Sequence, residues 1–441
     1  MYHLPFAARI VGIYSANDFS TLSILEERYL GFPILAEAIQ GVLWRVSNNV
    51  NAANLINLLA YLAFVLFLRI RVKIPFMISS VFYFSIPLIF IGFFSSYIDL
   101  FTNTFLAMAF IGLYFFWREK KMTDGLWVII FLAIANNSKY TSLVFSAIGY
   151  LLFLKIFFEP KISLQNIKKI LFVVISSVII FFPQFKNVVV YGNFIYPQKV
   201  PILNNIFHNG NQETNAKDQA PLYLRDSSSF IKFVYSFFEI NTIDDRRPHR
   251  WTIDQGDVSG DSKSFRMGGY FYFNIIFWMV LIIFIMFALK GDGRQFAVKT
   301  YVWLMGLILI VSLMPQSHEL RYWSFIPILL FSFILTFGKD LVDRNKLNFI
   351  YPMYIVFFVQ MMIFIFVFTN IGVLSVGAKN TVFSDYNLKS VASGYSGVCL
   401  YEMSNWRPFF YRLATKKDVN MQYVGFRESC NNKYVPYSGS K

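Results

Sequence analysis

The segment IPFMISSVFYFSIPLIFIGFFSSYIDLFTNTFLAMAFIGLYFFW, residues 74–117, holds a single charged side chain, Asp99, between two long apolar runs. A charge in such a segment costs roughly 2.5–3.5 kcal/mol if it faces lipid. Asp99 is therefore expected to meet water, a partner group or a substrate. If both apolar runs cross a membrane, the short turn at residues 95–99 lies at its surface and presents this acid there.

The composition extends this interpretation to the whole chain. Hydrophobic residues make up 56% and charged residues 15%, and the apolar residues form long blocks, which is typical of an all-α polytopic membrane protein. The net charge of +15 comes from basic residues clustered between those blocks, as in membrane loops, so a nucleic-acid partner is excluded. Two cysteines are too few for a Cys-rich metal site or a disulfide scaffold.

Ten apolar spans are predicted because about 20 apolar residues cross a bilayer. They lie at residues 52–68, 74–94, 97–117, 126–136, 141–158, 170–182, 269–289, 298–314, 322–337 and 349–373. The span at 126–136 is too short to cross ~30 Å of hydrocarbon at ~1.5 Å per residue. Its polar end, residues 136–140, is therefore expected to line a cavity or to be buried in protein.

Every second connection between consecutive spans is rich in basic residues. These connections are residues 69–73, 118–121, 161–169, 290–299 and 339–346. The positive-inside rule makes all of them cytoplasmic at once. The opposite face then carries residues 1–50, 95–99, 136–140, 183–268, 314–321 and the tail at 374–441. This topology leaves Met1 outside, so an upstream span is expected, which would make eleven.

The expected organisation is an outer segment at 1–50, spans at 51–182, an outer loop at 183–268, spans at 269–373 and an outer tail at 374–441. Apolar residues recur at helical spacing over 4–11 and 34–42, which predicts two amphipathic helices in the membrane interface. The aromatic run at 230–238 predicts a third such helix. Since the tail lies on the oxidising side, Cys399 and Cys430 are expected to form a disulfide in a small folded cap.

Six short motifs along the chain resemble, in order, the scattered motifs of the bacterial GT-C glycosyltransferases. The motifs are Tyr2-His-Leu-Pro-Phe-Ala-Ala-Arg9, Arg28-Tyr-Leu-Gly-Phe-Pro33, Ser96-Tyr-Ile-Asp-Leu100, Ser138-Lys-Tyr-Thr-Ser-Leu143, Tyr191-Gly-Asn-Phe-Ile-Tyr-Pro197 and Glu319-Leu-Arg-Tyr-Trp323. The resemblance covers residues 2 to about 327. It implies a polytopic enzyme that takes a sugar from a polyprenyl-phosphate carrier and transfers it to a lipid, glycan or protein on the outer face of a bacterial inner membrane.

The resemblance also implies roles for individual residues. A lipid-linked sugar needs cations for its phosphate, which Lys139 and Arg321 would supply, and a carboxylate for the acceptor or a metal, for which Asp99 is the candidate. In the family, an aspartate lies shortly before the Tyr-His-Leu-Pro motif. Here the motif begins at Tyr2, so this sequence does not contain that aspartate. The expected lining of the substrate cavity is completed by Tyr2, His3, Glu26, Glu27, Tyr97, Tyr140, His318 and Glu319.

Several alternatives stay open at the level of sequence. His3, Glu26 and Glu27 could hold a divalent metal ion, but their spacing is not that of a regular metal site. A transporter or lipid flippase is the main rival, although such proteins carry buried charges near the membrane midplane, whereas here the ionisable residues lie at span ends. A third interpretation is an inactive relative that only binds the lipid carrier.

Overall fold

The computed structural model describes residues 3–13, 23–158, 167–198, 224–240, 268–345 and 350–384, together with three strands in the tail. The first half of the chain forms α1 His3–Ile10, α2 Ser23–Gly31, α3 Leu35–Ser47, η2 Val50–Asn54, α4 Leu55–Phe67, η3 Leu68–Val72, α5 Phe76–Phe84, α6 Pro87–Phe93, α7 Asp99–Glu119, α8 Met122–Asn136, η4 Tyr140–Ser142 and α9 Leu143–Phe158. The second half forms α10 Ile167–Ile180, α11 Phe182–Tyr191, α12 Ser229–Phe237, α13 Tyr272–Ala288, α14 Gly291–Leu313, η7 Leu320–Trp323, α15 Phe325–Asn345 and α16 Ile350–Ser384.

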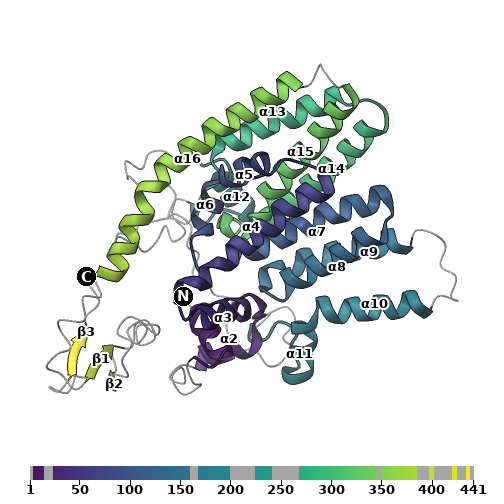
Figure 1. Cartoon of the computed structure of the whole chain (residues 1–441). Coiled ribbons are helices and arrows are strands. Elements are labelled where there is room, and N and C mark those ends of the chain that lie inside the picture. The colour runs from purple at the N-terminus through teal and green to yellow at the C-terminus, as the bar shows by residue number, and fades with distance from the viewer. Residues whose placement is uncertain are drawn as a thin grey trace.

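Helix α7 is the centre of the bundle. It packs against α4, α8, α9 and α15, which surround it in Figure 1. In the most apolar stretch of α7, 94% of the residues are buried, compared with 39% in the corresponding stretches of α9 and α14. Among the candidate membrane helices of the described residues, α7 thus has the least surface left for lipid.

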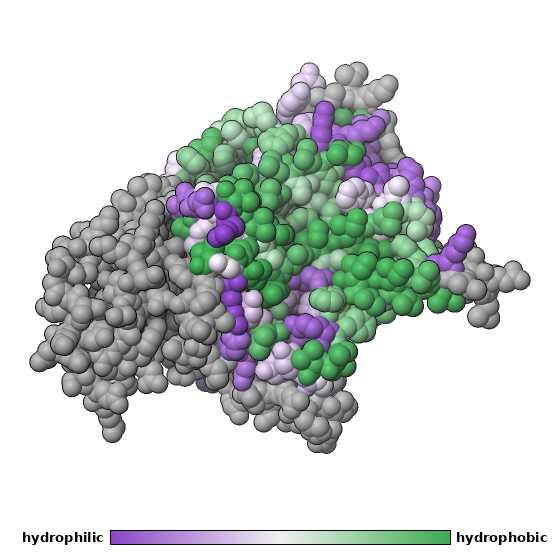
Figure 2. Space-filling model, turned by 60° about the horizontal axis from the view of Figure 1, so that its bottom comes forward, coloured by the Kyte–Doolittle hydropathy of each residue, from purple (hydrophilic) through white to green (hydrophobic). Residues whose placement is uncertain are grey.

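The outer helices expose a broad apolar surface. Large side chains such as Leu151, Phe287, Val302 and Phe358 are at least 60% exposed. Figure 2 shows a wide hydrophobic area over the helical part of the molecule, with hydrophilic side chains along its edges. An exposed apolar surface of this extent fits lipid tails rather than water. The chain is thus a polytopic helical membrane protein.

The number of spans differs from the expected ten or eleven. Within the described residues, five helices are long and apolar enough to cross a membrane, and two bent pairs, α5 with α6 and α10 with α11, bring the number to seven. The other three predicted spans correspond to shorter apolar helices at Met122–Asn136, Tyr272–Ala288 and Tyr354–Thr369. Every predicted span coincides with a helix or a bent pair, but apolar runs cannot reveal where a helix bends.

Each bend is stabilised by amide side chains that replace the lost helical hydrogen bonds. Between α5 and α6, which meet at 101°, the Ser85 carbonyl accepts a hydrogen bond from Asn274 Nδ2 at 2.7 Å. Between α10 and α11, which meet at 74°, Asn136 Nδ2 donates to the Ile180 carbonyl at 2.7 Å, and Asn137 Nδ2 donates to the Ile179 carbonyl at 3.0 Å. Without these donors the freed carbonyls would be costly at membrane depth.

The two ends of α7 carry different chemistry. At its C-terminal end Arg71 contacts Glu119 at 2.7 Å, and Arg118 contacts Asp340 at 3.0 Å, so three of the predicted basic connections meet. At its N-terminal end lies Asp99. The 21 residues of α7 separate these ends by about 30 Å at ~1.5 Å per residue. Three of the predicted basic connections therefore meet at the end of α7 that lies opposite Asp99.

The predicted amphipathic segments are helices. Segment 4–11 lies in α1 and segment 34–42 forms most of α3, and the two pack on each other with Ala7, Ala8 and Ala36 fully buried. The run at 230–238 forms α12, whose N-terminal Ser228 side chain accepts from the Ile231 backbone at 3.3 Å. Most of the remaining outer loop lies outside the described residues.

The strands among the described residues lie in the tail. Strands β1 Gly397–Tyr401, β2 Asn420–Val424 and β3 Tyr434–Tyr437 form a parallel sheet in the order β2-β1-β3. The expectation of an all-helical protein therefore holds for the regular elements up to Ser384, and the small cap expected in the tail contains these strands. Cys399 lies in β1, whereas Cys430 is outside the described residues, so the predicted disulfide stays a prediction.

Candidate functional site

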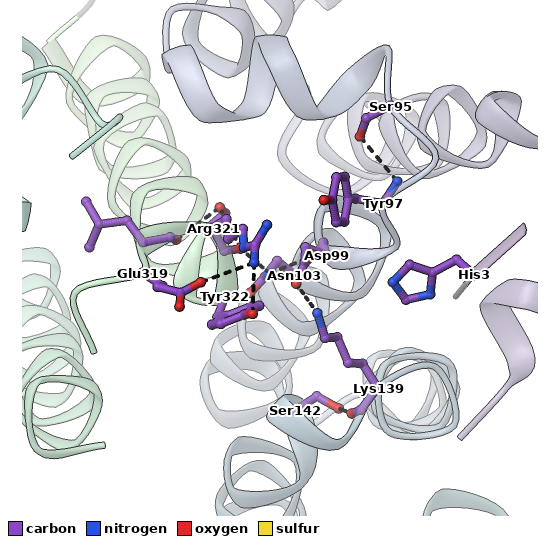
Figure 3. A network of polar contacts seen from close by, with 12 residues as sticks. His3, Ser95, Tyr97, Asp99, Asn103, Lys139, Ser142, Glu319, Arg321 and Tyr322 are labelled. Atoms are coloured by element: carbon purple, nitrogen blue, oxygen red, sulfur yellow. Dashed lines mark hydrogen bonds and ion pairs between the residues drawn. The ribbon is translucent and has the colours of Figure 1, made fainter. Parts of the chain in front are cut away.

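Asp99 and Lys139 form the centre of a polar cluster at one end of the bundle (Figure 3). Asp99 is the first residue of α7, and Lys139 lies between α8 and η4, where its ammonium group forms an ion pair with Asp99 Oδ1. Asp99 is only 5% exposed. Its second oxygen, Oδ2, has no hydrogen-bond partner among the described residues. The predicted acid and one predicted cation therefore meet directly.

The turn that leads into Asp99 is held by amide side chains from two other helices. Asn57 Nδ2, in α4, donates to the carbonyls of Gly92 and Ser95, both at 2.9 Å. Gln40 Nε2, in α3, donates to the Ser96 carbonyl at 2.9 Å. Because these contacts fix the backbone on either side of the turn, the position of the carboxylate is set before any ligand binds.

Arg321 completes the cluster from η7. Asn103 Nδ2 donates to the Asp99 carbonyl at 2.8 Å and to the Arg321 carbonyl at 3.2 Å, which ties η7 to the start of α7. The guanidinium group contacts Glu319 Oε2 at 3.1 Å and lies over the rings of Tyr97 and Tyr322, at 5.3 and 4.9 Å from their centroids. Figure 3 shows Arg321, Glu319 and Tyr322 on the same side of Asp99.

The charge of Arg321 is secured by its surroundings. Burial alone would lower the pKa of Arg321, but the nearby Tyr322, Asp99 and Glu319 outweigh it, so the pKa is raised above its usual value. Lys139 also lies over an aromatic face, 4.6 Å from the centroid of Tyr322. Two cations thus lie over the ring of Tyr322, with Asp99 and Glu319 as their carboxylate partners.

A cavity of about 310 Å³ adjoins this cluster and shares Lys139 and Tyr322 with it. Its lining is polar for a membrane protein: Arg28, Glu37, Ser138, Tyr140, Thr141, Gln198 and Gln316 contribute to it. Asp99 and Arg321 are not in this lining. Lys139 therefore links a charged cluster to a space that can hold a small polar molecule.

Glu37 is the carboxylate in the lining of this cavity, and sequence reasoning missed it. It lies in α3 and is 1% exposed. Its Oε1 lies 2.7 Å from His3 Nδ1, and its Oε2 has no hydrogen-bond partner within the described ranges. A signal was present: Glu37 follows Ile34 at helical spacing, so it interrupts the apolar stripe of segment 34–42.

Three of the motifs meet at Tyr140. The Tyr140 hydroxyl lies 2.7 Å from the Gly31 carbonyl and 2.8 Å from the Tyr196 carbonyl. Asn187 Nδ2 donates to the Gly31 carbonyl at 2.8 Å, and the rings of Tyr191 and Tyr196 stack at 3.9 Å. The motifs at 28–33, 138–143 and 191–197 are thus packed together beside the cavity.

The other predicted site residues fall into three groups. His3, Tyr97 and Glu319 belong to the cluster, and His318 is buried next to it. Glu26 is paired with Arg9, with 2.9 Å from Oε1 to Nη2, and Glu27 is partly buried in the same helix, α2. Tyr2 lies outside the described residues. In the part of the chain that the structure describes, no three His, Cys, Asp or Glu side chains are grouped as a metal site.

No protein-family model, curated protein or solved structure matches this chain.

Proposed function

We propose that this protein is a membrane glycosyltransferase that takes a sugar from a polyprenyl-phosphate carrier. The observation that carries the proposal is the convergence of the six motifs on one buried site. Residues that are far apart in the sequence, such as Asp99 and Glu319, lie in one polar network there. Buried charges cost free energy in a membrane protein, and a cluster of them is typical of a site that binds an ionic ligand.

Two features of the site support a phosphate as that ligand. Lys139 is paired with Asp99 and Arg321 with Glu319, and both cations lie over the ring of Tyr322. Arg321 could bind phosphate oxygens through its planar fork and Lys139 as a point charge. Because the cluster lies at a helix end, its ligand would meet it at the depth of lipid headgroups.

The neighbouring cavity supports a sugar or an acceptor hydroxyl as the second ligand. Its amides, hydroxyls and one carboxylate are the groups that bind sugars through hydrogen bonds. In the proposed reaction the acceptor oxygen forms a bond to the anomeric carbon and the bond from that carbon to the phosphate oxygen breaks. The leaving phosphate keeps the electron pair, and Lys139 and Arg321 neutralise it.

The proton of the acceptor hydroxyl then needs a base. We assign this role to Glu37, since it lines the cavity and has one oxygen without a partner among the described residues. His3, at 2.7 Å from the other oxygen, would hold the carboxylate in place. Asp99 is better suited to position Lys139, because it is already paired and is not in the cavity lining.

The proposed location is a bacterial inner membrane with the site facing the periplasm. The support is the gathering of basic connections at the opposite end of α7, which the positive-inside rule associates with the cytoplasm. The acceptor would be a lipid, glycan or protein of the cell envelope.

The test is turnover in liposomes that contain the purified protein and a panel of polyprenyl-phosphate-linked hexoses, N-acetylhexosamines and pentoses. Release of polyprenyl phosphate is the expected result for at least one donor. Glu37→Gln should reduce turnover while donor binding persists. Lys139→Ala should weaken donor binding about tenfold or more, because hydrogen bonds to charged groups contribute about 1.5–3 kcal/mol. Arg321→Lys should retain part of the binding that Arg321→Ala loses.

The same liposomes separate the alternatives. Lys339→Ala, at the opposite end of the bundle, is the matched control and should behave like the unchanged protein. Movement of intact donor between leaflets without release of polyprenyl phosphate would indicate a flippase. Donor binding with neither movement nor release would indicate a carrier-binding protein without activity.

A further inference from the structure

A second cavity lies at the opposite end of the bundle, between α7, α9, α14 and α15. It measures about 220 Å³ and is mostly apolar, with Phe110, Leu113, Trp117, Trp303 and Phe333 among the residues that line it. Trp117 is the residue before Arg118, whose ion pair with Asp340 marks the end with the basic connections. This cavity therefore opens near the membrane surface that is farthest from the polar site described above.

Two lysines give this apolar cavity a positive charge. Lys155, near the end of α9, and Lys299, in the first half of α14, both line it and are both exposed. Neither forms an ion pair within the described residues. Among the described residues, no acidic side chain lines this cavity. The cavity thus combines walls for a hydrocarbon chain with two cations that have no ion pair among the described residues.

A third cavity, at the same end of the bundle, also contains lysines but differs in its charge. It measures about 400 Å³ and also contains two lysines, Lys73 and Lys339. There, however, Asp343 is part of the lining and contacts Lys339 Nζ at 2.6 Å. One of its two positive charges is therefore neutralised by the protein itself.

From this contrast we infer that the cavity at Lys155 and Lys299 binds an anionic phospholipid of the leaflet on the basic side. The phosphate would lie against the two lysines and part of one acyl chain against the aromatic walls. Basic pockets between transmembrane helices are known to hold anionic headgroups in this way, and the indole rings suit the headgroup boundary. The site is independent of the proposed transferase activity.

The test is native mass spectrometry of the full chain in detergent with phosphatidylglycerol or phosphatidylcholine added. Phosphatidylglycerol should be retained and phosphatidylcholine should not. The double variant Lys155→Gln/Lys299→Gln should lose about fivefold in affinity per lysine, hence roughly twenty- to thirty-fold for the pair. Lys155→Arg/Lys299→Arg keeps both charges and should retain the lipid.

Lys339→Gln is the matched control, since it removes a lysine from the third cavity, and phosphatidylglycerol binding should not change. Equal retention of the two lipids by the unchanged protein would overturn the inference. So would unchanged phosphatidylglycerol binding by the double glutamine variant. All three variants alter exposed or partly exposed side chains, and a size-exclusion profile equal to that of the unchanged protein shows that they are folded.

Discussion

At the scale of single residues, the most consequential contact is the buried ion pair of Asp99 with Lys139. Their side chains are 7% and 14% exposed, so neither charge is well solvated. A buried pair contributes little net stability, but removal of one partner is costly because the other charge stays buried. The ion pair therefore holds the Lys139 ammonium group in position and adds little to the stability of the fold.

Asp99→Asn should consequently destabilise the protein by about 3 kcal/mol. The matched control is Asp343→Asn, whose carboxylate is paired with Lys339 but is 60% exposed, so its loss should cost less than about 1 kcal/mol. Thermal unfolding in detergent would measure both. Equal midpoints for the two variants would contradict the buried pair.

Tyr322 offers a second prediction at this scale. Burial raises the pKa of Tyr322 to about 12, against a usual value near 10. The phenol oxygen already accepts from Arg321 Nη2 at 3.0 Å, so the neutral hydroxyl keeps its proton as a donor for a ligand.

Because the folded state favours the protonated phenol, Tyr322 lowers the free energy of unfolding as the pH rises from about 10 to about 12, and it has no such effect below that window. The difference in ultraviolet absorbance between the unchanged protein and Tyr322→Phe, followed against pH, should show a midpoint near 12. A midpoint near 10 would show that the ring is solvated.

At the scale of elements, the site depends on close contact between chain segments that are far apart in sequence. A Cβ atom at Gly31 would lie 2.4 Å from the Tyr196 carbonyl oxygen and 2.7 Å from Pro197 Cδ. Backbone atoms at that distance cannot give way without moving the whole segment. The end of α2 and the motif at 191–197 therefore need a glycine where they meet.

Gly31→Ala should separate these segments, destabilise the protein by about 1–3 kcal/mol and weaken donor binding at the neighbouring cavity. Gly306→Ala is the control, because Gly306 lies in α14 and a Cβ there would meet no atom within 4 Å. That change should stabilise the helix by roughly 0.5–1 kcal/mol. Opposite shifts in the unfolding midpoint are expected, and a stabilising Gly31→Ala would refute the contact.

The elements also show what the sequence could predict. Within the described residues, the apolar runs coincide with the apolar helices, because burial in lipid requires hydrophobic residues. They could not locate the bends at Ser85 and Phe181, since these depend on amides from Asn274 and Asn136, which come from other helices. Glu37 was missed for the same reason, because its contact with His3 forms only when α1 and α3 pack together.

At the scale of the whole molecule, α7 connects two regions of opposite character. Its N-terminal end holds the polar cluster with Asp99, and its C-terminal end holds the basic connections and the lysine-lined cavity. Within the described residues, three of the basic connections that the alternation of basic loops placed on one face meet at the C-terminal end of α7. The alternation could not predict that Lys139 would pair with Asp99 and Arg321 with Glu319, since side-chain contacts depend on packing.

The most direct test of the central claim is a cryo-electron microscopy map of the protein in lipid nanodiscs with added polyprenyl phosphate. We expect phosphate density within hydrogen-bond distance of Lys139 Nζ and the Arg321 guanidinium, beside the cavity lined by Glu37. The same map of Lys139→Ala should lack that density. Phosphate density elsewhere in the protein, or an unoccupied cluster at saturating lipid, would contradict the claim that this cluster is a donor site.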